Sequence, residues 1–95
     1  MEHVYKLNIN NLRTRLFSSA MKAAIFMTKH ADQNHMKLLR INRYPGNVAV
    51  ELRREGHIKI AAVEAGSHKF YPVDGRTDLY LVGKFYYEIT KEEVD

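Results

Sequence analysis

The chain of 95 residues lacks cysteine, any long apolar run and any recognisable catalytic motif. Without cysteine there are no disulfide frameworks and no cysteine-based zinc sites, and the chain needs no oxidising compartment, so we expect it in the cytoplasm. The longest apolar stretch, residues 20–27, is interrupted by Lys22 and is far too short to span a membrane. The N-terminal residues do not show the charged and apolar regions of a signal peptide. We therefore expect no membrane association.

Motifs of cofactor and phosphate binding are also missing. The chain has no GxxxxGK[ST] and no GxGxxG pattern, and its carboxylates are not paired at a readable spacing. His30, Asp32 and His35 come nearest to a metal cluster. The five-residue step between the two histidines does not suit a helical ligand pair, so we interpret this group as a solvated helix end. These absences predict a protein that is not an enzyme and that holds no metal or cofactor.

The composition is that of one small folded domain. Apolar residues make up 45% of the chain, which is above the level of disordered proteins, and the length fits a single domain over residues 1–95 with a thin core. Lys and Arg number 15 against 11 acidic residues, giving a net charge of +4. This charge suits an anionic partner, although small basic domains also use such charge only for solubility.

Periodicity predicts one long helix among several strands. Alternation indicates a strand over residues 4–9, and apolar residues recurring every three or four positions indicate a helix over residues 12–31. Asn10 and Asn11 precede that helix as candidate N-caps. Further strands are expected over residues 36–44, 48–53, 57–63 and 79–90, with a short extended piece at 70–71 and a frayed, charged tail at 91–95.

A hairpin is predicted between residues 48–53 and 57–63. Pairing Leu52 with Ile58 and Val50 with Ile60 leaves a three-residue loop that ends at Gly56. Glycine then falls where such a loop requires a positive φ. The expected fold class is therefore α+β, with one long helix packed on one face of a four- to five-stranded, mostly antiparallel sheet. In this arrangement Leu16 packs in the core.

One helix leaves the other face of such a sheet open. The side chains expected on that face are mixed polar and aromatic: Glu51, Arg53, His57, Lys59, Ala61, Val63, Tyr80, Val82, Lys84 and Tyr86. A contiguous apolar patch among them would mark an interface, and a homodimer is the simplest way to bury it. The predicted binding residues are Tyr80, Tyr86, Lys84, Val63, Lys59, Arg53 and Arg54.

Two functions remain open from these residues. Tyrosine and arginine are enriched at protein interfaces, which predicts a small inhibitor or adaptor that docks on a protein partner. The identity of that partner stays open, and a protein that itself handles nucleic acid is one alternative. Aromatic rings interleaved with cations equally suit single-stranded nucleic acid. The plain alternative is an ordinary sheet surface, since tyrosine favours strands. No motif of a known family lies on these residues, although the short, cysteine-free chain has the style of phage proteins that inhibit host machinery.

Protein docking is the favoured prediction. A net charge of +4 is modest for a dedicated nucleic-acid binder, and Glu51, Glu64 and Glu88 are interspersed along the same predicted strands. A large cluster of Lys and Arg on one face of the folded protein would reverse that preference, because phosphate contacts supply most of the affinity for nucleic acid.

Overall fold

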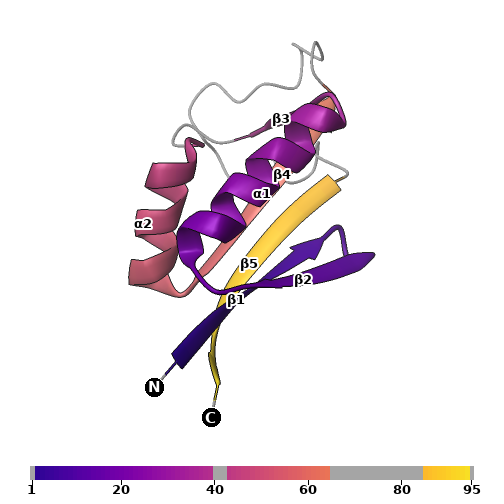
Figure 1. The fold of residues 1–95 in the computed structure, drawn as a ribbon. Helices are drawn as coiled ribbons and strands as arrows, with labels where there is room; N and C mark the ends of the chain where they lie inside the picture. The colour runs from indigo at the N-terminus through magenta and orange to yellow at the C-terminus, as the bar shows by residue number, and fades with distance from the viewer. Residues whose placement is uncertain (1, 40–42, 65–84, 95) are drawn as a thin grey trace.

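Five antiparallel strands and two helices form the part of the chain that the computed structural model describes, namely residues 2–39, 43–64 and 85–94. Both helices lie on the same face of the sheet (Figure 1). The strand order is β2-β1-β5-β4-β3. The elements are β1 (Glu2–Ile9), β2 (Arg13–Phe17), α1 (Ala20–Gln33), β3 (Met36–Leu38), α2 (Pro45–Glu55), β4 (His57–Glu64) and β5 (Phe85–Val94). The predicted α+β class with an antiparallel sheet is confirmed, with two helices in place of one.

A tight hairpin occupies the start of the predicted long helix. Asn10 and Asn11 have φ values of 51° and 59°, and the N–H of Leu12 donates to the carbonyl of Ile9 at 2.9 Å. Two consecutive positive φ angles define a type I′ turn, whose twist matches that of paired strands, and asparagine tolerates this conformation. The two asparagines therefore turn the chain from β1 into β2 and do not cap a helix.

Helix α1 begins eight residues later than predicted. Ser19 is its N-cap, and the Ser19 hydroxyl accepts a hydrogen bond from the N–H of Lys22 at 3.1 Å. The predicted apolar stripe joined Leu16 to Ala20, but Leu16 lies in β2 with 64% of its surface exposed. The expectation that Leu16 packs in the core is wrong, whereas Ala20, Ala23 and Met27 are buried as predicted.

Residues 45–55 form helix α2, so the predicted hairpin is wrong. Pro45 starts the helix, and Gly56 ends it with a φ of 79° while its N–H donates to the carbonyl of Leu52 at 2.8 Å. Proline at the first position and a left-handed glycine after the last are the usual boundaries of a helix. Val48 and Leu52 are four residues apart, a spacing shared by strand and helix, while Val50 between them is 57% exposed. The positive φ predicted for Gly56 is confirmed, at a helix end.

Strands β4 and β5 follow the predicted alternation. Ile58 and Ile60 of β4 pair with Ile89 and Tyr87 of β5. The predicted frayed tail is wrong for residues 91–94, which continue β5 and pair with residues 2–5 of β1. Strand β3 is shorter than predicted. The expected pieces at residues 70–71 and 79–84 lie outside the described residues.

The core lies between the helices and one face of the sheet. Every second residue of each central strand points into it, and the helices supply small residues that allow close packing. Its largest fully buried side chains are Tyr87, Leu7, Met27, Leu52, Ile60, Ile89 and Val48. Neither described helix is both long and apolar enough to cross a membrane.

Candidate functional site

The predicted binding face of the sheet is only partly present. Tyr86 is half-buried on the face away from the helices, and the Nζ atom of Lys59 lies 5.1 Å from the centre of its ring. Ala61 and Val63, expected to extend this patch, are only 3% and 9% exposed. The predicted exposed apolar patch is therefore wrong at these two positions. Tyr80 and Lys84 lie outside the described residues.

The predicted arginines do not join that face. Arg53 and Arg54 lie in the last turn of α2, and Glu51 precedes them in the same helix, so none of the three belongs to the sheet. Arg53 donates from Nε to the carbonyl of Ala49 at 3.3 Å, and Arg54 pairs with Glu55 at 3.0 Å. Cations in a final turn stabilise a helix by offsetting its negative end. This role accounts for both arginines without a ligand.

Acids offset the cations on the same sheet face. His57 Nε2 lies 2.6 Å from the Glu88 carboxylate, and Lys59 stands opposite Glu88 in the β4–β5 register. The residues that the structure describes on this face therefore provide no cluster of one charge.

A different surface gathers cations and rings. Arg13, Arg15 and Phe17 of β2 pair with residues of β1 whose side chains are buried in the core, so all three point towards the helices. On α1, Lys22, Lys29 and His30 lie four residues before, three after and four after Phe26, so all three neighbour Phe26 on one flank of the helix. We call the whole group the basic-aromatic edge: Arg13, Arg15, Phe17, Lys22, Phe26, Lys29 and His30.

Two direct contacts join β2 to α1 within the basic-aromatic edge. The guanidinium of Arg15 lies 4.6 Å from the centre of the Phe26 ring, and the rings of Phe17 and Phe26 are 5.3 Å apart. Both phenylalanines are half-buried, and Arg15 is exposed. A guanidinium that stacks on a ring keeps its N–H groups at the periphery, available for a phosphate. The pair thus presents charge and a flat apolar surface at one point.

His30 occupies the other end of the basic-aromatic edge. Its Nδ1 atom lies 2.7 Å from the hydroxyl of Tyr87, and its ring stacks on Phe85 with centres 6.4 Å apart and planes 20° from parallel. Burial, and secondarily the positive charge of Arg13, hold the pKa of His30 below its usual value of 6.5. Burial also raises the pKa of Tyr87 to about 12, so its hydroxyl keeps its proton at physiological pH. The imidazole is therefore neutral near pH 7.

The charge of the chain is concentrated in the segment that builds the basic-aromatic edge. Residues 3–31 contain five Lys or Arg residues and no Asp or Glu, and four of those five cations belong to the edge. All other positions together hold ten Lys or Arg against eleven Asp or Glu. The whole net positive charge therefore comes from residues 3–31. A local excess of cations of this kind attracts anions and orients their approach.

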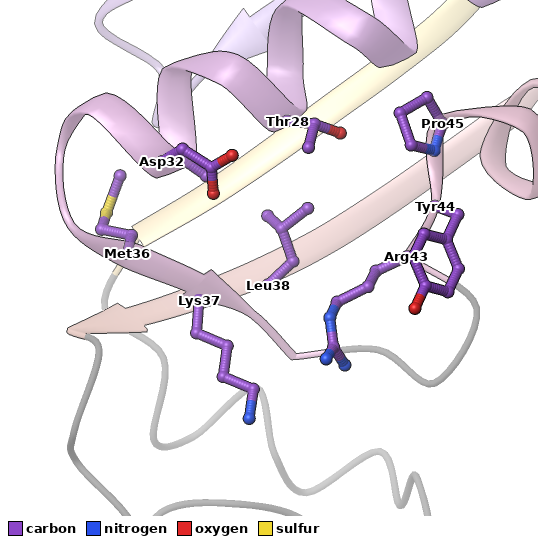
Figure 2. A pocket seen from close by; sticks show the side chains of 9 residues that line it. Thr28, Asp32, Met36, Lys37, Leu38, Arg43, Tyr44 and Pro45 are labelled. Carbon is purple, nitrogen blue, oxygen red and sulfur yellow. The ribbon is translucent and has the colours of Figure 1, made fainter.

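A small pocket lies on the opposite flank of α1. It has a volume of about 340 Å³ and is lined by residues of α1, of β3 and of the start of α2. In Figure 2, Thr28 and Asp32 from α1 lie on one side of Leu38, and Lys37 and Arg43 extend on the other. Its lining residues are Thr28, Ala31, Asp32, Met36, Lys37, Leu38, Arg43, Tyr44 and Pro45. The pocket mixes one carboxylate with two cations and so favours no single charge of ligand.

The histidines do not form a metal centre in the described part of the chain. Nowhere in residues 2–39, 43–64 or 85–94 do three His, Asp or Glu side chains gather closely enough to hold a metal ion. His30 is directed at Tyr87, while Asp32 lines the pocket on the other flank of the same helix.

Sequence reasoning missed the basic-aromatic edge. Arg13 and Arg15 fall inside the predicted helix over residues 12–31, where they would not contact Phe26 or His30. Two features of the sequence indicate the edge: the acid-free run over residues 3–31, and the Asn10-Asn11 pair, which favours a hairpin turn that folds β2 back along β1.

Comparisons of the chain with protein-family models, with curated proteins and with solved structures gave no match.

Proposed function

We propose that this protein is a non-enzymatic nucleic-acid-binding module of the cytoplasm that holds single strands along its basic-aromatic edge. One observation carries the proposal: the whole net positive charge of the chain comes from one acid-free segment, and four of its five cations belong to the basic-aromatic edge, where Arg15 lies over the half-buried Phe26 ring. Such a local excess of Lys and Arg beside aromatic rings supports nucleic acid over a protein partner.

The cations supply the electrostatic part of binding. Arg13, Arg15, Lys22 and Lys29 lie on adjacent elements, β2 and α1, so one phosphate backbone can pass along all four. Each phosphate that is neutralised releases condensed counterions, and this release drives association with nucleic acid. The proposal therefore requires a steep dependence of affinity on salt.

The rings favour single strands over duplexes. In a duplex the flat faces of the bases are already stacked, whereas in a single strand they are free to stack on protein rings or guanidinium planes. The guanidinium of Arg15, which lies over Phe26, and the neighbouring Phe17 ring, tilted 46° to Phe26, offer such planes. No glycine-spaced motif or recognition helix indicates a sequence preference, so we propose binding that tolerates many sequences.

Fluorescence anisotropy with a labelled single-stranded oligonucleotide tests the proposal. The variant Arg13→Ala/Arg15→Ala is compared with Arg53→Ala/Arg54→Ala, and each removes two positive charges from a net charge of +4. Loss of two charged phosphate contacts is expected to weaken binding by at least about tenfold in the first variant. The second variant is expected to bind nearly as the wild type does. Equal weakening in both variants would leave general charge as the explanation and would remove the basic-aromatic edge from it.

Protein docking stays a second candidate because of one further observation. Met21 and Ile25 of α1 and Val50 of α2 are 37%, 39% and 57% exposed on the helix layer. Met21 and Ile25 are four residues apart and so lie on the same side of α1. Exposed apolar residues of this kind suit contact with a partner protein or with a second copy of the chain. If this surface docks, Ile25→Glu/Val50→Glu abolishes association in light scattering or a pull-down while the fold persists. A nucleic-acid-handling partner and an inhibitor of the phage style both belong to this candidate.

A further inference from the structure

His30 belongs to the basic-aromatic edge and lies beside groups from several elements of the fold, among them the cation of Arg13. In the register of the sheet, Arg13 of β2, Ile9 of β1 and Tyr87 of β5 form one cross-strand row on the face towards the helices. His30 of α1 contacts Tyr87 in that row and is influenced by the charge of Arg13. The imidazole thus sits between a buried hydroxyl and an exposed cation.

The groups around His30 come from four elements. Strand β5 supplies the Tyr87 hydroxyl and the apolar ring of Phe85, and β2 supplies Arg13. Strand β1 supplies only the uncharged Ile9 in this row. Helix α1 itself adds the ring of Phe26 and, close by in sequence, Lys29 and Asp32. Asp32 lines the pocket on the other flank of the helix, where α2 begins. No acid within this set faces the imidazole.

We infer that binding of nucleic acid at the basic-aromatic edge is linked to uptake of one proton by His30, so that the protein holds single strands more tightly as the pH falls. This inference rests on the proposed function. A phosphate bound by Arg13 brings to the imidazole a negative charge that none of the groups named above supplies. It offsets the repulsion from Arg13 and attracts the imidazolium, so the bound state favours protonation.

The proton has a defined place in the hydrogen-bonded pair. We assign to the free protein the arrangement in which the Tyr87 hydroxyl donates to Nδ1 of the neutral imidazole and the ring hydrogen is on Nε2, which the 2.7 Å contact between Nδ1 and the hydroxyl oxygen permits. On binding, Nδ1 takes a proton from solvent and becomes a donor to the Tyr87 oxygen. The hydroxyl hydrogen of Tyr87 must then turn away from Nδ1. Tyr87 keeps its proton throughout, so the pair gains one positive charge in all.

The direction of the pH dependence follows from linkage. Bound phosphate raises the pKa of His30 from its lowered value in the free protein. Between these two pKa values the complex holds more protons than the free protein does. Affinity therefore decreases there as the pH rises, by at most about tenfold per pH unit for one proton. Above both pKa values the imidazole is neutral in either state, and this dependence vanishes.

Isothermal titration calorimetry with oligothymidylate, in buffers of different ionisation enthalpy, measures the protons taken up on binding. Thymine bases do not titrate near neutral pH, so the uptake reports on the protein. The expected result for the wild type, measured from about pH 7 to 5, is an uptake of at most one proton that is largest between the two pKa values of His30. His30→Gln keeps a hydrogen-bonding side chain for Tyr87 and is expected to lose the uptake. His57→Gln on the opposite sheet face is the matched control and is expected to retain it.

A second measurement keeps the test independent of any substitution. NMR titration of the wild-type His30 ring hydrogens, with and without oligothymidylate, gives both pKa values directly. A higher pKa in the complex is expected. Tight binding with no proton uptake and no change in this pKa would overturn the inference and leave the proposed function standing. Loss of uptake in His57→Gln would assign the proton to another site and overturn it equally. No binding of oligothymidylate at any pH would instead overturn the proposed function.

Discussion

The guanidinium of Arg15 lies 4.6 Å above the ring of Phe26, and this contact joins the edge strand β2 to the long helix α1. Because Arg15 comes from the second strand of a hairpin, the contact exists only if the chain reverses at Asn10 and Asn11. The turn brings the cations of β2 beside the cations of α1, which makes a continuous charged edge from two separate segments.

Arg15→Gln tests the energetic worth of that contact. The substitution removes the charge over the ring but keeps a polar side chain, and the expected loss of unfolding free energy is about 0.5–1 kcal/mol, as for an exposed cation–π pair. Urea denaturation measures it. Arg54→Gln is the control, because Arg54 contacts the exposed Glu55 and not a ring, and its expected change is smaller. Equal losses in the two variants would mean that the ring contact adds nothing.

Leu7→Ala and Leu16→Ala distinguish the two interpretations of residues 12–17. Leu7 is fully buried in β1, so its truncation should cost about 2–5 kcal/mol. Leu16 is largely exposed in β2, so its truncation should change the unfolding free energy by no more than about 0.5 kcal/mol. Thermal or urea denaturation of both variants provides the comparison. If Leu16→Ala lowered the unfolding free energy by several kcal/mol, Leu16 would be buried, as the predicted helix over residues 12–31 requires, and its placement in β2 would be contradicted.

The two glycines at the ends of α2 should respond oppositely to alanine. Gly56 has a φ of 79°, so Gly56→Ala is strained whatever space surrounds it and should destabilise the protein by about 1 kcal/mol. Gly46 lies in the first turn of α2, where an added Cβ would meet no atom within 4 Å, and Gly46→Ala should be neutral or stabilise by about 0.5–1 kcal/mol. Melting temperatures that fall alike in both variants would contradict a helix that starts at Pro45 and ends before Gly56.

Stability should fall with acid because of His30. Its pKa is lowered in the folded protein, so the unfolded chain binds more protons once the pH drops through about 6.5. The contribution is complete above that pH and is lost as the pH falls towards the folded-state pKa. Chemical denaturation from about pH 7.5 to 5 should show this loss in the wild type and a flatter profile in His30→Gln. Parallel profiles would mean that His30 is not held neutral by folding.

The fold class could be predicted from the sequence because alternation along β1, β4 and β5 reflects real burial on one face. The local errors came from spacings that two structures share. Val48 and Leu52 fit a strand as well as a helix, and Leu16 and Ala20 fit a helix although one lies in β2 and the other in α1. Boundary residues decided both cases: Ser19 as N-cap, and Pro45 with Gly56 around α2.

The candidate site could not be predicted because it depends on which segments meet. Tyr86 and Lys59 lie on the same sheet face as predicted, and the Lys59 ammonium contacts the Tyr86 ring. Arg53 and Arg54 were placed beside them only through the incorrect hairpin. The residues of the basic-aromatic edge come together through the β1–β2 turn and the packing of α1 on the sheet, and periodicity within one segment does not report such a meeting.

The salt dependence of oligothymidylate binding tests the central claim most directly. The slope of log affinity against log salt concentration counts the phosphates that the protein neutralises, at about 0.7 per phosphate for a single strand. Removing Arg13 and Arg15 together should reduce the slope by about 1.4 relative to the wild type, whereas removing Arg53 and Arg54 should leave it unchanged. A slope that is the same in all three proteins, or one reduced only by the loss of Arg53 and Arg54, would contradict binding at the basic-aromatic edge.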